Sequence, residues 1–481
     1  MGHTTAIPTR SFGFYLNGDW VMHGRDVVVT SPYDRTVVAV VYEADRHDAE
    51  VALESAVRAF AVTRKIPSYQ RAAILHKITD GIAARREEVA RTICQEAGKP
   101  IKTARIEVER AINTFHIAAE ESTRIYGEYI PLDTLESTAG RWGLLRRFPL
   151  GPVFAITPFN FPLNLVAHKV APAIAAGCPL ILKPAPQTPV SSLLLAEIVH
   201  ESGWPQGAFA VMPLSNENAG LLVADDRIKL LTFTGSAAVG WQLKSKAGKK
   251  RVTLELGGNA GVIVHSDTDL AHAAQRCVVG GFSYAGQTCI SVQRILVHRP
   301  VFDSFTRPLV EGVRKLKIGD PMHEDTDVPP LIREQDAIRV TEWIDEAVKG
   351  GAKLLCGGRR KGSVVEPAVL TGTSPSMRVN CAEIFGPVVT VEPYDEFREA
   401  VRQINDSPYG LQAGVFTRDA VLIQMAFDEL EVGGVIVGDV PSFRVDQMPY
   451  GGVKDSGLGR EGLRYSIEDM TERKLLVMAL K

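Results

Sequence analysis

A chain of 481 residues exceeds what one hydrophobic core usually serves, so we expect two or three domains. Its 45% hydrophobic residues, its net charge of −2 and its near balance of 54 basic and 56 acidic residues are those of a globular protein, and they argue against nucleic acid or an anionic membrane as its partner. The apolar runs are far shorter than a membrane span, no leader pattern is visible and the six cysteines are scattered, so we expect a reduced, cytoplasmic protein without a metal site.

The first part of the chain predicts helices. Apolar residues recur every three to four positions over Asp48–Phe60, Arg71–Glu87 and Glu107–Glu121. This spacing places the apolar side chains on one face of a helix. We therefore expect three amphipathic helices before the first regular strands.

After Arg146 the pattern changes to short apolar strands that alternate with helices. The expected strands are Val153–Thr157, Pro179–Lys183, Ala208–Pro213 and Leu230–Thr234, and the expected helices are Leu163–Ala176 and Pro189–Ser202. Strands that alternate with helices of this length predict a parallel, doubly wound sheet, so the expected fold class is α/β.

A second α/β series begins near Leu254 and continues to about residue 460. The expected strands of this series are Val262–Val264, Ile295–His298 and Val388–Pro393. Two further segments, Gly140–Phe148 and Lys474–Leu480, have the pattern of exposed strands. Because an uncovered apolar edge strand promotes aggregation, we expect a second subunit to cover them in a homodimer or homotetramer.

A glycine-containing loop follows the strand Leu230–Thr234. Gly235 and Ser236 begin the next helix, where free backbone N–H groups and the helix dipole favour a phosphate group. The spacing to Gly240 is Gly-x4-Gly, so the usual dinucleotide fingerprint is absent and an ordinary strand–helix turn is an alternative. Lys183 ends another strand of the same sheet, which favours the phosphate interpretation because such sheets bind ligands at these strand ends.

Three side chains could carry chemistry. Cys289, in the loop Gly286–Ile290, offers a thiol, which is a good nucleophile once it loses its proton. Glu255 lies between two leucines, where loss of water raises the pKa of a carboxyl group toward that of a useful base. Asn160, between two phenylalanines, offers an amide donor for a developing oxyanion. The alternatives are a buried structural cysteine, a solvent-facing glutamate and an asparagine that serves a turn.

Seven motifs occur in a fixed order along the chain. They are ITPFNFPLN (156–164), LILKPAPQTP (180–189), FTGS (233–236), LELGGN (254–259), GQTC (286–289), EIFGPV (383–388) and PYGGVKDSGLGREG (449–462). On these motifs the sequence resembles the aldehyde dehydrogenase superfamily over essentially its full length. The resemblance implies a Rossmann-like cofactor domain, an α/β catalytic domain and a small β extension for oligomerisation. We expect them at 1–125 with 147–253, at 254–462, and at 126–146 with 463–481, respectively.

The resemblance also implies roles for single residues. Cys289 is the expected nucleophile, Glu255 the base, and Asn160 with the Cys289 N–H the oxyanion hole. The residues expected to hold NAD or NADP are Thr157, Pro158, Lys183, Gly235, Ser236, Gly240, Glu383 and Phe385. By this mechanism Cys289 adds to a small aldehyde, hydride leaves to the nicotinamide, and Glu255 activates the water that releases the acid.

One position bears on the choice between NAD and NADP. In many NAD-preferring relatives a glutamate lies three residues beyond the lysine, whereas here Pro186 follows Lys183 at that distance. Loss of this carboxylate removes a repulsion against a 2′-phosphate. We expect use of both cofactors, or of NADP in preference.

By resemblance, five residues line the substrate tunnel: Arg110, Phe161, His168, Ile290 and Arg444. Two guanidinium groups near one pocket suit an anionic group on the aldehyde, although both arginines could instead pair with local acids such as Glu107 and Asp446. The sequence is similar to the branch that contains lactaldehyde, phosphonoacetaldehyde and non-phosphorylating glyceraldehyde-phosphate dehydrogenases. Phe161 and Ile290 depart from the histidine and arginine of the phosphonoacetaldehyde type, so a small hydroxylated or singly charged aldehyde is expected, such as lactaldehyde, glyceraldehyde phosphate or succinic semialdehyde.

Two other functions deserve comparison. An enzyme that acylates coenzyme A would pass the thioester to a thiol, but such relatives typically lack the carboxylate that Glu255 provides. A non-catalytic binding or structural member of the family would have lost Cys289, Glu255 or Asn160, and all three are present.

Overall fold

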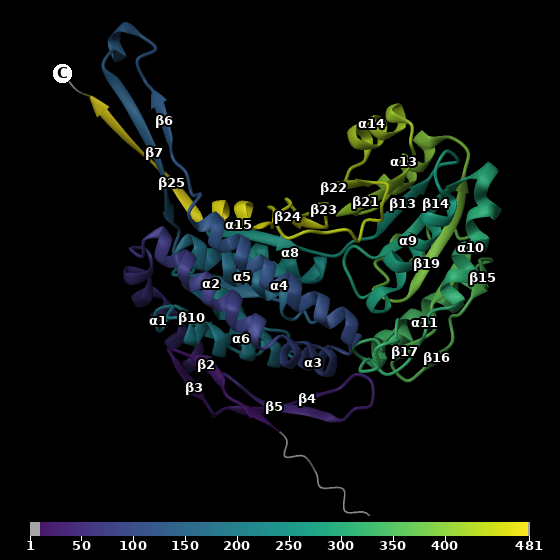
Figure 1. The fold of residues 1–481 in the computed structure, drawn as a ribbon, viewed down its shortest axis with the longest axis horizontal. Coiled ribbons are helices and arrows are strands. Elements are labelled where there is room, and N and C mark those ends of the chain that lie inside the picture. Colours follow the sequence, from purple (N-terminus) through teal and green to yellow (C-terminus); the bar gives the residue numbers. More distant parts are fainter. Residues whose placement is uncertain (1–9, 480–481) are drawn as a thin grey trace, which may run out of the picture.

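The computed structural model describes residues 10–479, so the expectations for residues 1–9 and for Leu480 lie outside it. Within this range, two large sheets carry helices on both faces, and a smaller third sheet projects from the body as an arm (Figure 1). The α/β fold class expected from the sequence is confirmed. No helix among the described residues is both long and apolar enough to cross a membrane.

The first sheet is parallel at its centre. Five strands run parallel in the order β12-β11-β8-β9-β10, and β2, β3 and β24 extend its edges in antiparallel pairing. The bounds are β2 Phe14–Leu16, β3 Asp19–Val21, β8 Val153–Ile156, β9 Leu180–Lys183, β10 Phe209–Val211, β11 Leu230–Thr234, β12 Arg251–Glu255 and β24 Gly457–Leu458. The range 254–462 therefore contributes two pieces to the first sheet, because β12 extends to Glu255 and β24 pairs with it.

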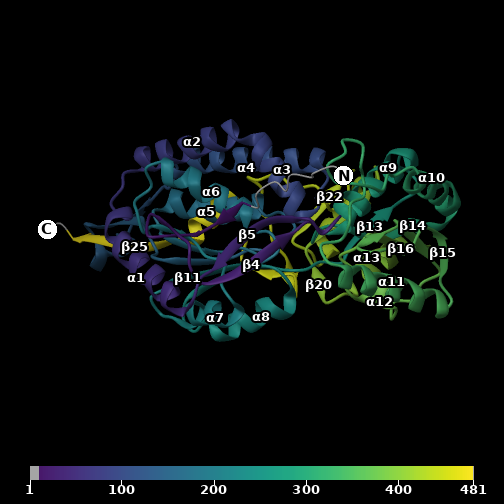
Figure 2. The ribbon, with the colours of Figure 1, turned by 90° about the horizontal axis from the view of Figure 1, so that it is seen from below.

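Helices cover both faces of this sheet (Figure 2). One face carries α2 Ser68–Ala84, α3 Arg86–Ala97, α4 Ile101–Ser122, α5 Asn164–Ala176 and α6 Val190–Glu201, and the other carries α1 Arg46–Thr63, α7 Asn216–Ala224 and α8 Ala237–Lys246. The helix expected at Arg71–Glu87 is in fact two helices. Arg85 breaks it by adopting φ −109° and ψ 18°, outside the helical region, which periodicity alone does not reveal.

The second sheet has the order β15-β18-β19-β14-β13-β21-β22, with only β15 antiparallel. The strands are β13 Ala260–Val264, β14 Val292–His298, β15 Lys353–Cys356, β18 Ala368–Thr371, β19 Val388–Tyr394, β21 Gln412–Phe416 and β22 Gly434–Val437. The surrounding helices are α9 Leu270–Phe282, α10 Phe302–Arg314, α11 Glu334–Lys349, α12 Arg378–Cys381, α13 Phe397–Asn405 and α14 Ala420–Glu429. Val262 and Ile263 pack into different clusters on the two faces, which explains why this strand is continuously apolar.

The arm consists of β6 Glu128–Pro131, β7 Arg141–Pro149 and β25 Thr471–Ala479. β25 pairs antiparallel with β7 along its whole length, from Thr471 opposite Pro149 to Ala479 opposite Arg141. The helix α15 Leu463–Asp469 joins the arm to the body (Figure 1). The two strands expected from the sequence are therefore each other's neighbours within one chain.

Smaller elements complete the chain. They are β1 Ser11–Phe12, β4 Arg25–Thr30, β5 Val37–Glu43, β16 Arg360–Lys361, β17 Val364–Val365, β20 Tyr409–Gly410, β23 Val453–Lys454, and the 3-10 turns Glu136–Thr138, Ser283–Gly286 and Arg299–Val301.

Candidate active site

The strand order of the first sheet creates a crevice. β9 and β10 follow β8 on one side of the sheet, whereas β11 and β12 lie on the other side of β8, so the strand order reverses between β8 and β11. In parallel sheets ligands bind outside the carboxyl ends of the two strands where the order reverses in this way. The segments that leave these two ends begin at Thr157 and Gly235, and both carry predicted site residues.

A cleft of about 280 Å³ opens at this position. The predicted residues that line it are Pro158, Asn160, Gly235, Ser236, Glu255, Cys289, Glu383 and Phe385. These residues come from both large sheets and are up to 227 positions apart in sequence, since the range runs from Pro158 to Phe385. Thr157, Lys183 and Gly240 do not line it.

The loop that carries Cys289 has an unusual backbone. Tyr284 and Ala285 have positive φ angles of 51° and 53°, and Gly286 follows with φ 70°. Two non-glycine residues in the left-handed region cost about 1 kcal/mol or more each, so the surroundings must hold them. The Tyr284 hydroxyl donates to the Ala97 carbonyl at 2.7 Å, and the Gln287 side chain accepts the Ile332 N–H at 2.9 Å. The nucleophile loop is therefore fixed from both sides.

Cys289 is partly exposed to the cleft, and its Sγ lies 3.0 Å from the Tyr450 hydroxyl oxygen. Burial raises the pKa of this thiol to about 11, although the Tyr450 hydrogen bond and the positive charge of Arg444 act in the opposite direction. In this structure the thiol is protonated at neutral pH. A group that helps it ionise is therefore needed for nucleophilic attack.

Asn160 lies directly beside the Cys289 loop. Its Nδ2 donates to the Gln287 carbonyl oxygen at 2.9 Å, which leaves its second N–H for another acceptor. The backbone N–H of Cys289 makes no hydrogen bond to another of the described residues. Gly258 allows this loop to sit close to the first sheet, because a Cβ there would overlap the Cys289 carbonyl oxygen. The geometry fits two donors aimed at one oxyanion.

Glu255 ends β12 and is buried at the wall of the cleft. Neither of its carboxyl oxygens is hydrogen bonded to a protein group of residues 10–479. Burial first, and then the negative charge of Glu461, raise the pKa of Glu255 well above its usual value. A buried carboxyl group without partners is poised to exchange a proton with a ligand or a water molecule in the cleft.

Arg444 lies behind the nucleophile. Its guanidinium carbon is 3.7 Å from the centre of the Tyr450 ring, and it donates to Glu461 at 3.0 Å. Lys169 donates to the same carboxylate at 2.9 Å, so Glu461 is held between two cations. Although burial acts to raise it, these cations lower the pKa of Glu461 to about 2. Arg444 therefore has one acidic partner and a position next to the reactive tyrosine–cysteine pair.

Arg110 and His168 share Asp446. Arg110 donates to Asp446 at 2.8 Å, and the His168 Nε2 lies 3.0 Å from the same oxygen. His168 is buried, and burial lowers its pKa, so it is neutral at pH 7. The alternative that both arginines pair with nearby acidic residues is confirmed for the pairing itself. The partners are Asp446 for Arg110 and Glu461 for Arg444.

The other two expected substrate residues, Phe161 and Ile290, are apolar, and Ile290 packs with Cys289. Phe161 packs edge-on against Tyr284, and the Lys99 ammonium lies 3.5 Å from the centre of its ring. Lys99 pairs with the buried Glu107, which also accepts the N–H groups of Leu163 and Asn164 at the start of α5. Ile290 is buried and clusters with Tyr450. Glu107 thus supports the loop that carries Asn160 and Phe161 and does not bind Arg110.

The residues expected to hold the cofactor differ in their positions. Ser236 is the exposed N-cap of α8, and no side chain caps this helix, so its N-terminal N–H groups face outward unused. Glu383 accepts the Gly258 N–H at 3.0 Å, and burial raises its pKa to about 7. Lys183 ends β9 and makes no ion pair with a described residue. The glycine at position 240 is explained by packing, because a Cβ there would overlap the side chain of Leu256.

Lys169, Tyr450 and Glu461 are among the residues around the site that were not predicted. Tyr450 and Glu461 lie inside the motif 449–462, so the motif contained them, but nothing in the sequence indicates that they reach Cys289 and Glu255. Lys169 lies in α5, a helix whose residues are all buried. A lysine in this helix was a usable signal, because a fully buried lysine requires a partner.

Comparison with known proteins agrees with this geometry. The Aldehyde dehydrogenase family profile matches residues 20–476. The 3-sulfolactaldehyde dehydrogenase of Priestia megaterium is 44% identical over 99% of this chain and 100% of its own. Among solved structures, aldehyde dehydrogenase 21 from Physcomitrella patens in complex with the reaction product succinate is 47% identical, with a TM-score of 0.97 over 98% of this chain and 99% of that chain. Glyceraldehyde-3-phosphate dehydrogenase GapN from Methanocaldococcus jannaschii complexed with NADP is 37% identical, with a TM-score of 0.92 over 95% and 100%.

The hydrogen bond between Tyr450 and Cys289 predicts a measurable effect on the thiol. In Tyr450→Phe the donor that favours the thiolate is lost, so the pKa of Cys289 rises and its alkylation by iodoacetamide at pH 9 slows about fivefold. Mass spectrometry of the Cys289 peptide over a range of pH measures the rate. The exposed Cys381 in the same molecule is the internal control and keeps its rate. An unchanged midpoint at Cys289 would contradict this assignment.

Proposed function

The chain belongs to the aldehyde dehydrogenase family of NAD(P)-dependent oxidoreductases, and on that premise we propose that it oxidises a small aldehyde with an anionic end to the carboxylic acid. One observation carries the proposal. Cys289, Glu255 and Asn160 line the same cleft as Gly235 and Ser236, at the reversal of the strand order. A nucleophile, a base and an oxyanion donor thus adjoin the expected cofactor loop.

The residue roles follow from this geometry. The Cys289 thiol loses its proton to solvent water in the cleft, and the thiolate, stabilised by the Tyr450 hydroxyl and the charge of Arg444, adds to the aldehyde carbon. The free N–H of Asn160 and the Cys289 N–H hold the alkoxide that forms. Glu255, freed of its proton, takes one from a water molecule, which attacks the thioester and releases the acid.

The cofactor would be held at the same cleft. When bound, it supplies the acceptor for the hydride that leaves the carbon attached to Cys289. The uncapped start of α8 suits a pyrophosphate, and Glu383 offers a carboxylate for ribose hydroxyl groups. Pro186 is exposed where a carboxylate would repel a 2′-phosphate, and the cation Lys183 lies three residues before it. These features support NADP, with NAD as an alternative, and the relative crystallised with NADP is consistent with that preference.

The charge around the nucleophile supports an anionic substrate. Arg444 lies against the Tyr450 ring, and its positive charge acts on the Cys289 thiol. Burial raises the pKa of Glu255, so its carboxyl group resists acquiring a negative charge beside the substrate. A buried guanidinium next to Cys289 suits a carboxylate or sulfonate on the aldehyde. Relatives named for sulfolactaldehyde and crystallised with succinate agree with this class.

The competing functions have less support. Transfer of the acyl group to coenzyme A would leave Glu255 without a task, although it is buried in the cleft. A non-catalytic role would leave unexplained why the three reactive groups converge. Phe161 and Ile290 offer no polar group to a phosphonate, so we do not favour that substrate.

The roles of Cys289 and Glu255 can be separated by rapid mixing with NADP and succinic semialdehyde. In Glu255→Gln one equivalent of reduced nicotinamide forms at once, and steady turnover then falls at least about a hundredfold because the thioester is not hydrolysed. In Cys289→Ala neither phase appears. Cys381→Ala, which alters an exposed thiol, keeps full activity. Full turnover in either of the first two variants would contradict the mechanism.

The two arginines predict a substrate-dependent loss of activity. In Arg110→Gln and Arg444→Gln, kcat/KM for succinic semialdehyde falls about tenfold or more, because a charge-assisted contact is lost, whereas kcat/KM for butanal changes little. Arg307→Gln, at an exposed site on α10, is the matched control. An equal loss for both aldehydes would mean that the arginines only support the fold.

We also propose that the arm mediates a homodimer or homotetramer in a reducing cytoplasm. Leu475, Leu476 and Val477 are consecutive and about half exposed, at 46%, 52% and 49%. Successive strand residues face opposite sides, so both faces of this three-stranded sheet need cover. All six cysteines are unpaired, which supports a reducing compartment.

Substitution in the arm is expected to dissociate the oligomer. Leu476→Lys places a charge on a surface that a second copy would bury, so the mass measured by light scattering after gel filtration falls toward 52.4 kDa. Val421→Lys introduces the same charge at an exposed apolar residue of α14 and leaves the mass unchanged. A wild-type protein that already elutes as a monomer would disprove the role of the arm.

A further inference from the structure

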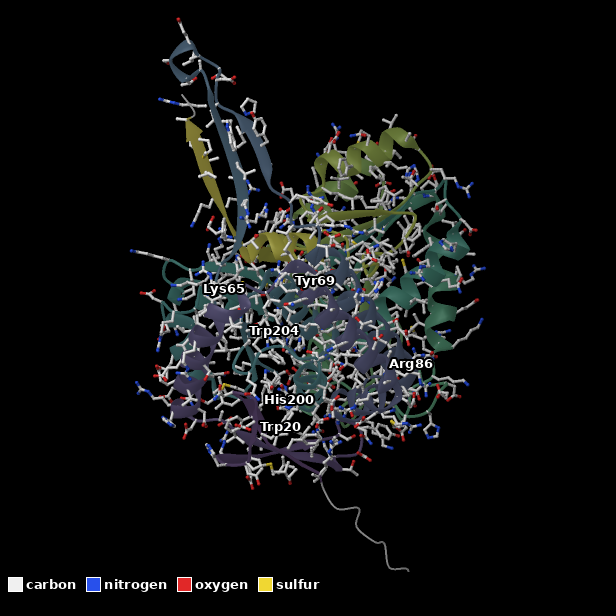
Figure 3. The ribbon with its side chains drawn as sticks, turned by 60° about the vertical axis from the view of Figure 1, so that its left-hand side comes forward. Trp20, Lys65, Tyr69, Arg86, His200 and Trp204 are labelled. Atoms are coloured by element: carbon white, nitrogen blue, oxygen red, sulfur yellow. The ribbon has the colours of Figure 1, made fainter. Side chains whose placement is uncertain are left out.

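A second concave site lies at the base of the arm, where the arm joins the body. It is a pocket of about 420 Å³ between the start of α2, the end of α4 and β7. Lys65, one of its residues, lies on the body just below the arm (Figure 3). The pocket shares no lining residue with the active-site cleft.

The pocket is strongly basic. Five of its residues are cationic and none is acidic: Arg64, Lys65, Arg71, Arg146 and Arg147. Among the described residues only Arg147 has an acidic partner, Glu468, at 3.5 Å. Arg64 and Arg146 instead lie over the rings of Phe60 and Phe148. Four positive charges around one pocket are thus left without a carboxylate.

Arg71 is a partly buried cation of the pocket that lacks an acidic partner among the described residues. Its Nε is buried and has no hydrogen-bond partner among residues 10–479. Burial lowers the pKa of this guanidinium, and no carboxylate is close enough to raise it. A partly buried guanidinium without a counterion is unfavourable unless a ligand provides one.

The start of α2 adds backbone donors to the same pocket. Pro67 occupies the N-cap, no side chain caps the helix, and its first turn contains no acidic residue. The N–H groups of Ser68 and Tyr69 donate to no described residue. The 17-residue helix therefore presents unused N–H groups and the positive end of its dipole beside Arg71.

We propose that this pocket binds a small tetrahedral dianion, namely inorganic phosphate or the phosphoryl group of a small metabolite. Guanidinium groups and helix N-terminal N–H groups are the donors that phosphate oxygens prefer. Because the pocket is built from both the body and β7, its occupant ties the base of the arm to the body.

Titration calorimetry of the full-length protein with inorganic phosphate tests the proposal. We expect one site per chain, with an affinity that falls as sodium chloride is added. Arg71→Gln weakens binding about tenfold or more, since one charge-assisted contact is lost. Arg307→Gln removes the same charge from an exposed site on α10 and leaves binding unchanged. Arg444→Gln also leaves it unchanged, which separates this pocket from the active site.

The double variant Arg64→Gln/Lys65→Gln changes only exposed side chains, so it provides the test if Arg71→Gln fails to fold. Glycerol phosphate run in parallel distinguishes the sources, because tighter binding than that of inorganic phosphate indicates a phosphorylated metabolite. No binding by the wild type up to about 10 mM would overturn the proposal. Equal binding by the pocket variants, or loss of binding in Arg444→Gln alone, would also overturn it. Binding only in Leu476→Lys would overturn it too, because it would mean that acidic side chains of a second copy fill the pocket in the wild type.

Discussion

The hydrogen bond from the Asn160 amide to the Gln287 carbonyl joins the two halves of this molecule at the reactive cysteine. Asn160 follows a strand of the first sheet, and Gln287 precedes a strand of the second. Neither half alone contains a nucleophile, a base and an oxyanion donor. Close contact at Gly258 and the left-handed backbone of Tyr284 and Ala285 are tolerated because this junction must be tight.

Buried charge organises the surroundings of that junction. Glu107 is neutralised by Lys99 and caps the helix after Asn160, while Glu461 is neutralised by Lys169 and Arg444. Such pairs are costly to desolvate and add little net stability. Their value here is position, since each charge fixes a segment that carries a reactive group. Glu255 is the exception, because its buried carboxyl oxygens accept no hydrogen bond from residues 10–479.

The arm and the basic pocket at its base carry uncompensated apolar surface and positive charge on the outside of the molecule. The apolar strand β25 is exposed and requires cover, while the pocket below it holds cations without counterions. Both features are incomplete in a single chain. A second copy and a small anion are the partners that would complete them, and β7 contributes to both.

The sequence by itself determined the α/β class and the positions of most strands and helices, and its motifs predicted Cys289, Glu255 and Asn160 as site residues, which the fold brings to one cleft. It did so because strand periodicity and short motifs are local properties of the chain. The break at Arg85, the pairing of Arg110 with Asp446 and of Arg444 with Glu461, and the contact of Tyr450 with Cys289 were decided only by the tertiary structure. These features depend on which distant segments meet and which side chains lose water together. No pattern of neighbouring residues specifies these contacts. Tyr450 and Arg444, the groups that lower the pKa of Cys289, are more than a hundred positions away in the sequence, and so is Asp446, the counterion of Arg110.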